Sequence, residues 1–104
     1  MNTAYSTTGL RNLYLGNNEI IQCQPILGGQ PWDLIGGAAT LILADPSGNL
    51  TVIPATINSA GGAYAPWTVA GAVGQWTRCW KLTDPTGFVQ FSAPKAFGVA
   101  SSPY

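Results

Sequence analysis

Histidine is absent from this sequence, and charged side chains are scarce. The 104 residues include four Lys or Arg and four Asp or Glu, which is 8% of the chain and gives a formal net charge of zero. An average soluble domain is about 25% charged, and a freely diffusing monomer usually depends on net charge for its solubility. Because 46% of the residues are hydrophobic, this composition favours a protein whose surface contacts other protein.

Clusters of Lys and Arg are also missing. Nucleic-acid binding is driven by neutralising phosphates and adsorption to anionic membranes by basic patches, so we expect neither a nucleic-acid nor a membrane partner. There is no run of about eighteen apolar residues that could span a bilayer. Residues 1–9 (MNTAYSTTG) lack the basic and apolar regions of a signal peptide, and we therefore expect synthesis in the cytoplasm without export.

Groups that carry catalysis are few. Without histidine there is no Ser-His or Cys-His pair, and the only carboxylates are Glu19, Asp33, Asp45 and Asp84. Asp45 and Asp84 each begin a D-P-[ST]-G segment, a turn in which the Asp side chain accepts backbone hydrogen bonds. Two cysteines without histidine or clustered acids make no zinc site. We expect a non-enzymatic protein with no metal and no cofactor.

Strand patterns dominate what the chain does contain. Thirteen Gly and eight Pro interrupt it too often for amphipathic helices. Short apolar segments with turn signals between them are typical of an all-β antiparallel sandwich or barrel. Seven or eight strands are expected, over residues 10–15, 19–26, 38–44, 50–57, 63–69, 75–83, 88–92 and 97–99. Segment 38–44 (AATLILA) is the most apolar and should be central, whereas Pro54 should place its strand at an edge or a bulge.

Two of these strands carry the cysteines, Cys23 and Cys79, an arrangement that invites comparison with the disulfide of immunoglobulin domains. Side chains alternate across a strand, and in segment 75–83 the even positions form the core face: Trp76, Arg78, Trp80 and Leu82. The Arg78 stem should pack there, with its guanidinium stacked or reaching a carboxylate. Cys79 should point away from the core, which favours two free thiols over a disulfide.

Between residues 26 and 99 several short motifs follow one another in a distinctive order. They are GQPWDLIG (29–36), an apolar strand, DPSG (45–48), GAY (62–64), GQW (74–76), TDPTG (83–87) and SAPKAFGV (92–99). In this order they resemble the immunoglobulin-like domain of tailed-bacteriophage structural proteins, similar to the amino-terminal domain of baseplate upper proteins and to small Ig-like virion proteins. That family usually carries more charge on its exposed faces than this chain does.

The resemblance implies an antiparallel Ig-like β-sandwich over residues 10–99, with an amino-terminal arm at 1–9 and a carboxy-terminal tail at 100–104. Such domains join, decorate or cement parts of a virion and catalyse nothing. The implied partners are other virion proteins of the capsid, neck or tail, and further copies of the chain in a homo-oligomer. The sequence does not distinguish a capsid cement from a neck, tail or fibre adaptor. The two end segments order on a neighbouring subunit or are frayed.

Aromatic residues outside the expected core face are the candidate contacts with other protein. Trp32 and Trp67 lie beside prolines, and Tyr5 and Tyr104 lie in the two end segments. On a surface poor in charge, exposed aromatics favour protein contact. Two alternatives stay open. One is a module that binds carbohydrate or a host surface through these aromatics. The other is an Ig-like part of a cellular adhesin or secretion system, which the missing signal peptide disfavours.

Overall fold

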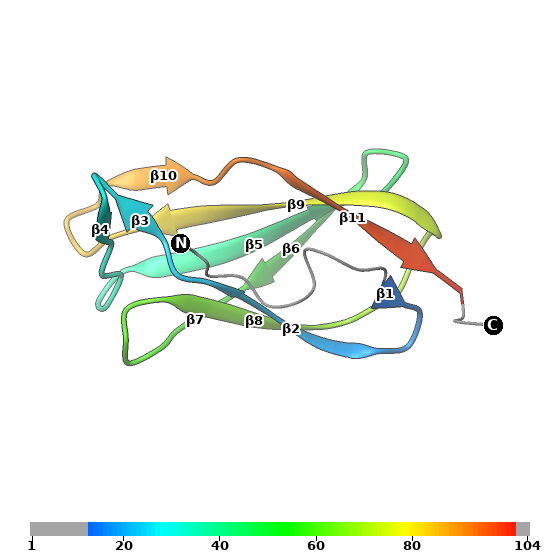
Figure 1. Cartoon of the computed structure of the whole chain (residues 1–104), viewed down its shortest axis with the longest axis horizontal. Coiled ribbons are helices and arrows are strands. Elements are labelled where there is room, and N and C mark those ends of the chain that lie inside the picture. Colours follow the sequence, from blue (N-terminus) through cyan, green and yellow to red (C-terminus); the bar gives the residue numbers. More distant parts are fainter. Residues whose placement is uncertain (1–12, 102–104) are drawn as a thin grey trace.

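The computed structural model describes residues 13–101, which form strands and connecting turns but no helix (Figure 1). The expected all-β class is confirmed. In this part of the chain there is consequently no helix that could cross a membrane. The described residues contain eleven strands: β1 (Leu13–Tyr14), β2 (Asn18–Cys23), β3 (Ile26–Leu27), β4 (Gln30–Pro31), β5 (Ala38–Ala44), β6 (Leu50–Pro54), β7 (Thr56–Ile57), β8 (Ala63–Thr68), β9 (Gly74–Thr83), β10 (Val89–Phe91) and β11 (Lys95–Ala100).

Two sheets face each other and enclose the core. The larger has the strand order β1-β11-β9-β5-β6, with β10 also paired to β9, and the smaller has the order β2-β8-β7. Figure 1 shows the smaller sheet below the larger one, with the β3–β4 hairpin at one end. Buried side chains come from both sheets, among them Ile21 of β2, Leu41 of β5, Ala65 of β8 and Trp80 of β9. Alternation along each strand sends these residues inward.

The larger sheet is not wholly antiparallel, which corrects the expectation from sequence. β1 runs parallel to β11, with Leu13 opposite Val99 and Tyr14 opposite Ala100, and this side of the sheet curls toward the smaller one (Figure 1). A parallel pair needs a long connection, and here most of the chain separates the two strands. No local turn signal marks such a pairing, so strand patterns alone could not reveal it.

Two segments are divided differently from the prediction. Segment 50–57, expected as one strand, is two: β6 pairs with β5 in the larger sheet and β7 pairs with β8 in the smaller one. The chain changes sheet at Ala55, whose N–H donates to the Ala39 carbonyl at 3.0 Å. The other difference is the β3–β4 hairpin: residues 19–26 were expected as one strand, but β2 ends at Cys23 and Ile26 belongs to β3. As Pro54 suggested, β6 lies at a sheet edge.

In β9, the core face was predicted correctly. Its buried positions are Trp76, Arg78, Trp80 and Leu82, and the positions between them are half-buried or exposed. Cys79 lies on the outer face, where its thiol donates to the Ser92 carbonyl at 3.1 Å. Both cysteines are free in the structure, and the predicted outward direction of Cys79 is confirmed.

Both D-P-[ST]-G segments close hairpins with the same hydrogen bonds. Asp45 Oδ1 accepts from the Ser47 and Asn49 amides in the β5–β6 turn. Asp84 Oδ1 accepts from the Thr86 and Phe88 amides in the β9–β10 turn. These two carboxylates therefore have the turn role that the sequence predicted. The arm at 1–9 lies outside the described residues, as does 102–104 of the expected tail, whereas Ala100 still belongs to β11.

Candidate protein-contact site

The two tryptophans predicted to contact other protein lie at opposite ends of the molecule. Trp32 directly follows β4, beside the β3–β4 hairpin, and Trp67 lies near the end of β8 (Figure 1). Tyr5 and Tyr104, the other two predicted contact residues, fall outside the described residues. The structure thus does not bring Trp32 and Trp67 together into one surface.

Trp67 belongs to an aromatic cluster that covers one end of the core. Its ring is half-buried and lies 5.3 Å from the Trp76 ring centroid and 6.1 Å from that of Phe97, in tilted and edge-on arrangements. Trp76 is fixed by its indole N–H, which donates to the Ala72 carbonyl at 2.8 Å. Offset and edge-on ring pairs of this kind stabilise a core beyond simple burial. Trp67 therefore has a packing role and is still partly open to solvent.

Trp32 is more deeply placed, since only 8% of it is exposed. Its backbone N–H donates to the Pro25 carbonyl at 2.8 Å, which extends the pairing of the β3–β4 hairpin. Its indole N–H donates to Asp84 Oδ2 at 3.3 Å, and its ring meets Phe88 edge-on at 5.9 Å. These contacts tie the hairpin to the β9–β10 turn. The sequence predicted Trp32 as a surface contact with other protein. In the structure its ring is buried and forms one wall of a pocket.

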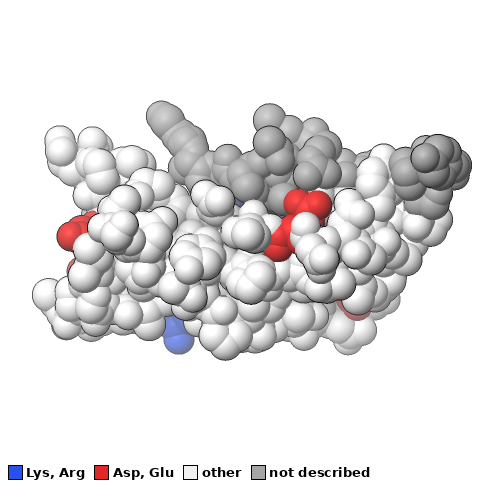
Figure 2. Space-filling model, turned by 90° about the horizontal axis from the view of Figure 1, so that it is seen from below, with Lys and Arg blue, Asp and Glu red and all other residues white. Residues whose placement is uncertain are grey.

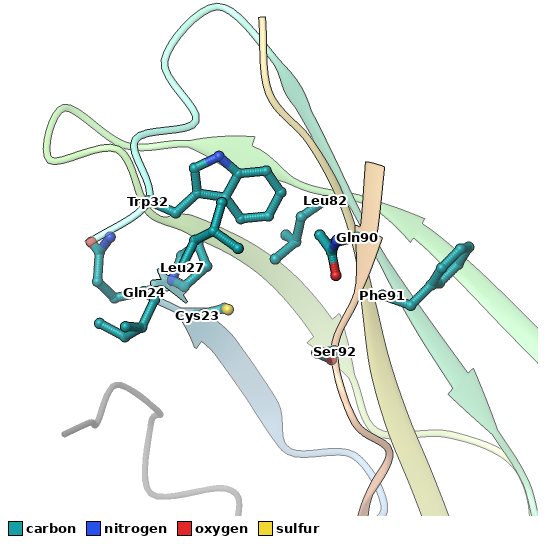
Figure 3. A pocket seen from close by; sticks show the side chains of 10 residues that line it. Cys23, Gln24, Leu27, Trp32, Leu82, Gln90, Phe91 and Ser92 are labelled. Atoms are coloured by element: carbon teal, nitrogen blue, oxygen red, sulfur yellow. The ribbon is translucent and has the colours of Figure 1, made fainter. Parts of the chain in front are cut away.

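That wall belongs to a pocket of about 290 Å³ between the end of β2, the β3–β4 hairpin and strands β9 and β10. Figure 3 shows Cys23, Leu27, Trp32 and Leu82 pointing toward one another, with Ser92 at the far side and Phe91 turned away. Pockets for drug-sized ligands span about 300–1,000 Å³, so this one lies just below that range. It has the size to accept one apolar side chain of another protein.

Exposed apolar side chains lie beside this pocket. We define the apolar rim as Ile26 and Leu27, which line the pocket, and Phe88, whose ring meets Trp32 edge-on; all three are open to solvent. Ile26 is 53% exposed and Phe88 46% exposed. Large apolar side chains grouped on a surface are typical of interaction sites. The rim was not predicted from the sequence, although Gly28-Gly29 directly after the apolar pair Ile26-Leu27 is a signal for a two-residue hairpin, and both glycines have positive φ, 61° and 81°.

The pocket holds a thiol that is poorly suited to chemistry. Burial raises the pKa of Cys23 to about 11, while the nearby Arg78 charge opposes the rise. A thiol is nucleophilic only as its thiolate, so Cys23 stays protonated and inert near neutral pH. Asp84, at the neighbouring turn, has a lowered pKa because the Thr86 hydroxyl donates to its carboxylate, with smaller contributions from the Phe88 and Thr86 amides and from Trp32. The Asp84 carboxylate therefore stabilises the β9–β10 turn.

Few charges interrupt the surface around these features. Seen from below the orientation of Figure 1, the molecule is mostly uncharged, with isolated acidic and basic side chains (Figure 2). Within residues 13–101, no three side chains of the metal-binding types gather in one place. Models of protein families, characterised proteins and solved structures were all compared with this chain, and none matches it.

Proposed function

We propose that this chain is a non-enzymatic structural protein of a tailed-phage virion that acts through contacts with other virion proteins. The observation that carries the proposal is the apolar rim beside a largely apolar pocket, on a molecule in which only 8% of the residues are charged. Interface anchors are large apolar side chains that fill such pockets, and charged residues are depleted around them. A neighbouring subunit would place one apolar side chain against Trp32 and cover the rim.

Within this proposal the fold is a variant of the Ig-like sandwich. Two facing sheets with a shared core support that assignment, and the parallel β1–β11 pair is the departure from it. The motif order of the sequence supports placement in the virion, as a capsid cement or as a neck, tail or fibre adaptor. A carbohydrate module finds less support, because all four tryptophans are buried or half-buried and leave no flat indole face for a sugar.

Binding to particles tests the proposal. Particles that lack this chain would be prepared from cells in which its gene is deleted. These particles would be titrated with the purified protein and then separated from unbound protein by sedimentation. The wild-type chain should co-sediment in a saturable way. Ile26→Lys places a charge on the rim at an exposed position, so it should weaken binding by about tenfold or more without unfolding the protein.

Val73→Lys is the matched control, because Val73 is 54% exposed and lies in the β8–β9 connection, away from the rim. It should bind like the wild-type chain. Failure of the wild-type chain to co-sediment would contradict the proposed function. Equal binding by Ile26→Lys and the wild-type chain would show that the rim is not the contact surface.

A further inference from the structure

Strand β6 forms an open edge of the larger sheet. Among the described residues it has a strand neighbour on one side only, β5, and its sequence Leu-Thr-Val-Ile-Pro contains no charge. Leu50 is 65% exposed and Val52 is 59% exposed. Exposed apolar edge strands are templates for pairing with another chain, and proteins that avoid such pairing protect them with charges, prolines, bulges or covering segments. β6 has neither a charge nor a bulge, and its one proline, Pro54, stands at its last position.

The backbone of β6 shows which groups are available for pairing. Asp45 N donates to Asn49 O at 2.9 Å, and Ala55 N donates to Ala39 O at 3.0 Å, at the two ends of the β5–β6 ladder. Hydrogen-bonded and non-bonded pairs alternate along an antiparallel ladder. The odd-numbered residues of β6 therefore bond to β5, and the even-numbered ones turn their N–H and C=O groups to the open edge. Those residues are Leu50, Val52 and Pro54.

We propose that two copies of this chain pair through β6 across a two-fold axis, antiparallel, with Val52 opposite the same residue of the second copy. In this register the two Val52 residues exchange N–H···O bonds, and each Leu50 N–H reaches the Pro54 carbonyl of the other copy. Proline lacks an N–H, and it falls at the end of the paired segment, where the loss is smallest. Two larger sheets become one continuous sheet.

Charge and shape favour a second copy as the occupant. A two-fold contact brings each residue near its own equivalent, and like charges placed opposite each other are destabilising. Neither β5 nor β6 contains a charged residue, so the pairing meets no such repulsion. On the outer face, Ile42 lies opposite Val52 and Ala44 opposite Leu50. The pairing therefore extends an existing apolar row across both copies, and β-branched cross-strand pairs stabilise a sheet. This inference does not depend on the virion or on the apolar rim.

Self-association of the full chain, measured by sedimentation equilibrium, tests the pairing. The wild-type protein should form a reversible dimer. Val52→Lys should weaken dimerisation by about tenfold or more, because it sets two like charges side by side at the axis. Val73→Lys and Ile26→Lys add the same charge at similarly exposed positions and should dimerise like the wild-type chain. A wild-type monomer at all concentrations, or an unchanged Val52→Lys dimer, would overturn the inference.

Two further measurements test the pairing even if the Val52→Lys variant does not fold. Hydrogen exchange on the wild-type chain should show the Leu50 and Val52 amides slowed at high concentration and fast on dilution, while the Thr51 amide, bonded within the sheet, stays slow in both. In a Val52→Cys variant the two Cα atoms would be about 5.5 Å apart, within the range of a disulfide. Oxidation should then yield a covalent dimer that the wild-type chain and Val73→Cys do not form. Exchange at Leu50 and Val52 that is independent of concentration would refute the pairing.

Discussion

Replacing Trp76 by alanine should lower the free energy of unfolding by about 3–5 kcal/mol. The indole is buried between the sheets, 5.3 Å from the Trp67 ring and 6.2 Å from the Phe97 ring. A buried aromatic removes about 200 Å² from water, and at about 25 cal/mol per Å² this is worth about 5 kcal/mol. Trp67 is only half-buried and can move into part of the space, which brings the cost toward the lower end of the range.

Urea unfolding followed by circular dichroism at one low protein concentration measures this loss without relying on the tryptophan signal. Trp76→Phe keeps an aromatic ring but loses the hydrogen bond to the Ala72 carbonyl, so it should cost about 1 kcal/mol for that bond plus a part of the packing loss. Val73→Ala, at an exposed position, should stay within about 0.5 kcal/mol of the wild-type protein. A Trp76→Ala loss below about 1 kcal/mol would refute burial of the even positions of β9, and with it the outward placement of Cys79.

Three further predictions concern the turn, a thiol and a glycine. The pKa of Asp84 is lowered in the fold, so its stabilisation is complete above the ordinary carboxyl pKa and is lost as the pH falls through the lowered value; Trp32 fluorescence should change in that acid range, and the same acid step in Asp84→Asn would contradict this. Cys23, with its pKa raised to about 11, should react with iodoacetamide at pH 8 far more slowly in the folded than in the denatured protein; peptide mass spectrometry measures both rates, and equal rates would place the thiol at the surface. A Cβ atom at Gly37 would lie 2.0 Å from the Thr83 carbonyl oxygen, so Gly37→Ala should lower the melting temperature by several degrees, an overpacking cost of about 1–3 kcal/mol, and an unchanged melting temperature would show that this turn can move.

Local chemistry explains why much of the fold could be predicted from the sequence. Alternation of apolar residues in segment 75–83 identified the core face of β9, and the run AATLILA identified β5, an interior strand of the larger sheet. Both D-P-[ST]-G segments act as the turns that their residue types predict. In each case the signal lies within ten residues, where side-chain period and turn chemistry act directly.

The features of the fold that could not be predicted from the sequence depend on pairing between segments far apart in the chain. The parallel contact of β1 with β11 joins the two ends of the described chain, and neither strand carries a sign of its partner. The division of segment 50–57 at Ala55 likewise depends on which sheet each half meets. Trp32 illustrates the same limit for the candidate site. Its place outside the expected core face suggested a contact with other protein, but its ring packs against Asp84 and Phe88, which lie more than fifty residues further along the chain.

Copy number in the particle tests the central claim most directly. Quantitative mass spectrometry of purified virions, from cells that carry the gene for this chain, compares its amount with that of the major capsid protein. If the chain is a virion structural protein, we expect a fixed ratio that matches the symmetry of a shell or of a ring, large for a capsid cement and small for a neck or tail component. A chain that is expressed in those cells but absent from purified particles, or present there in no fixed ratio, would contradict the account.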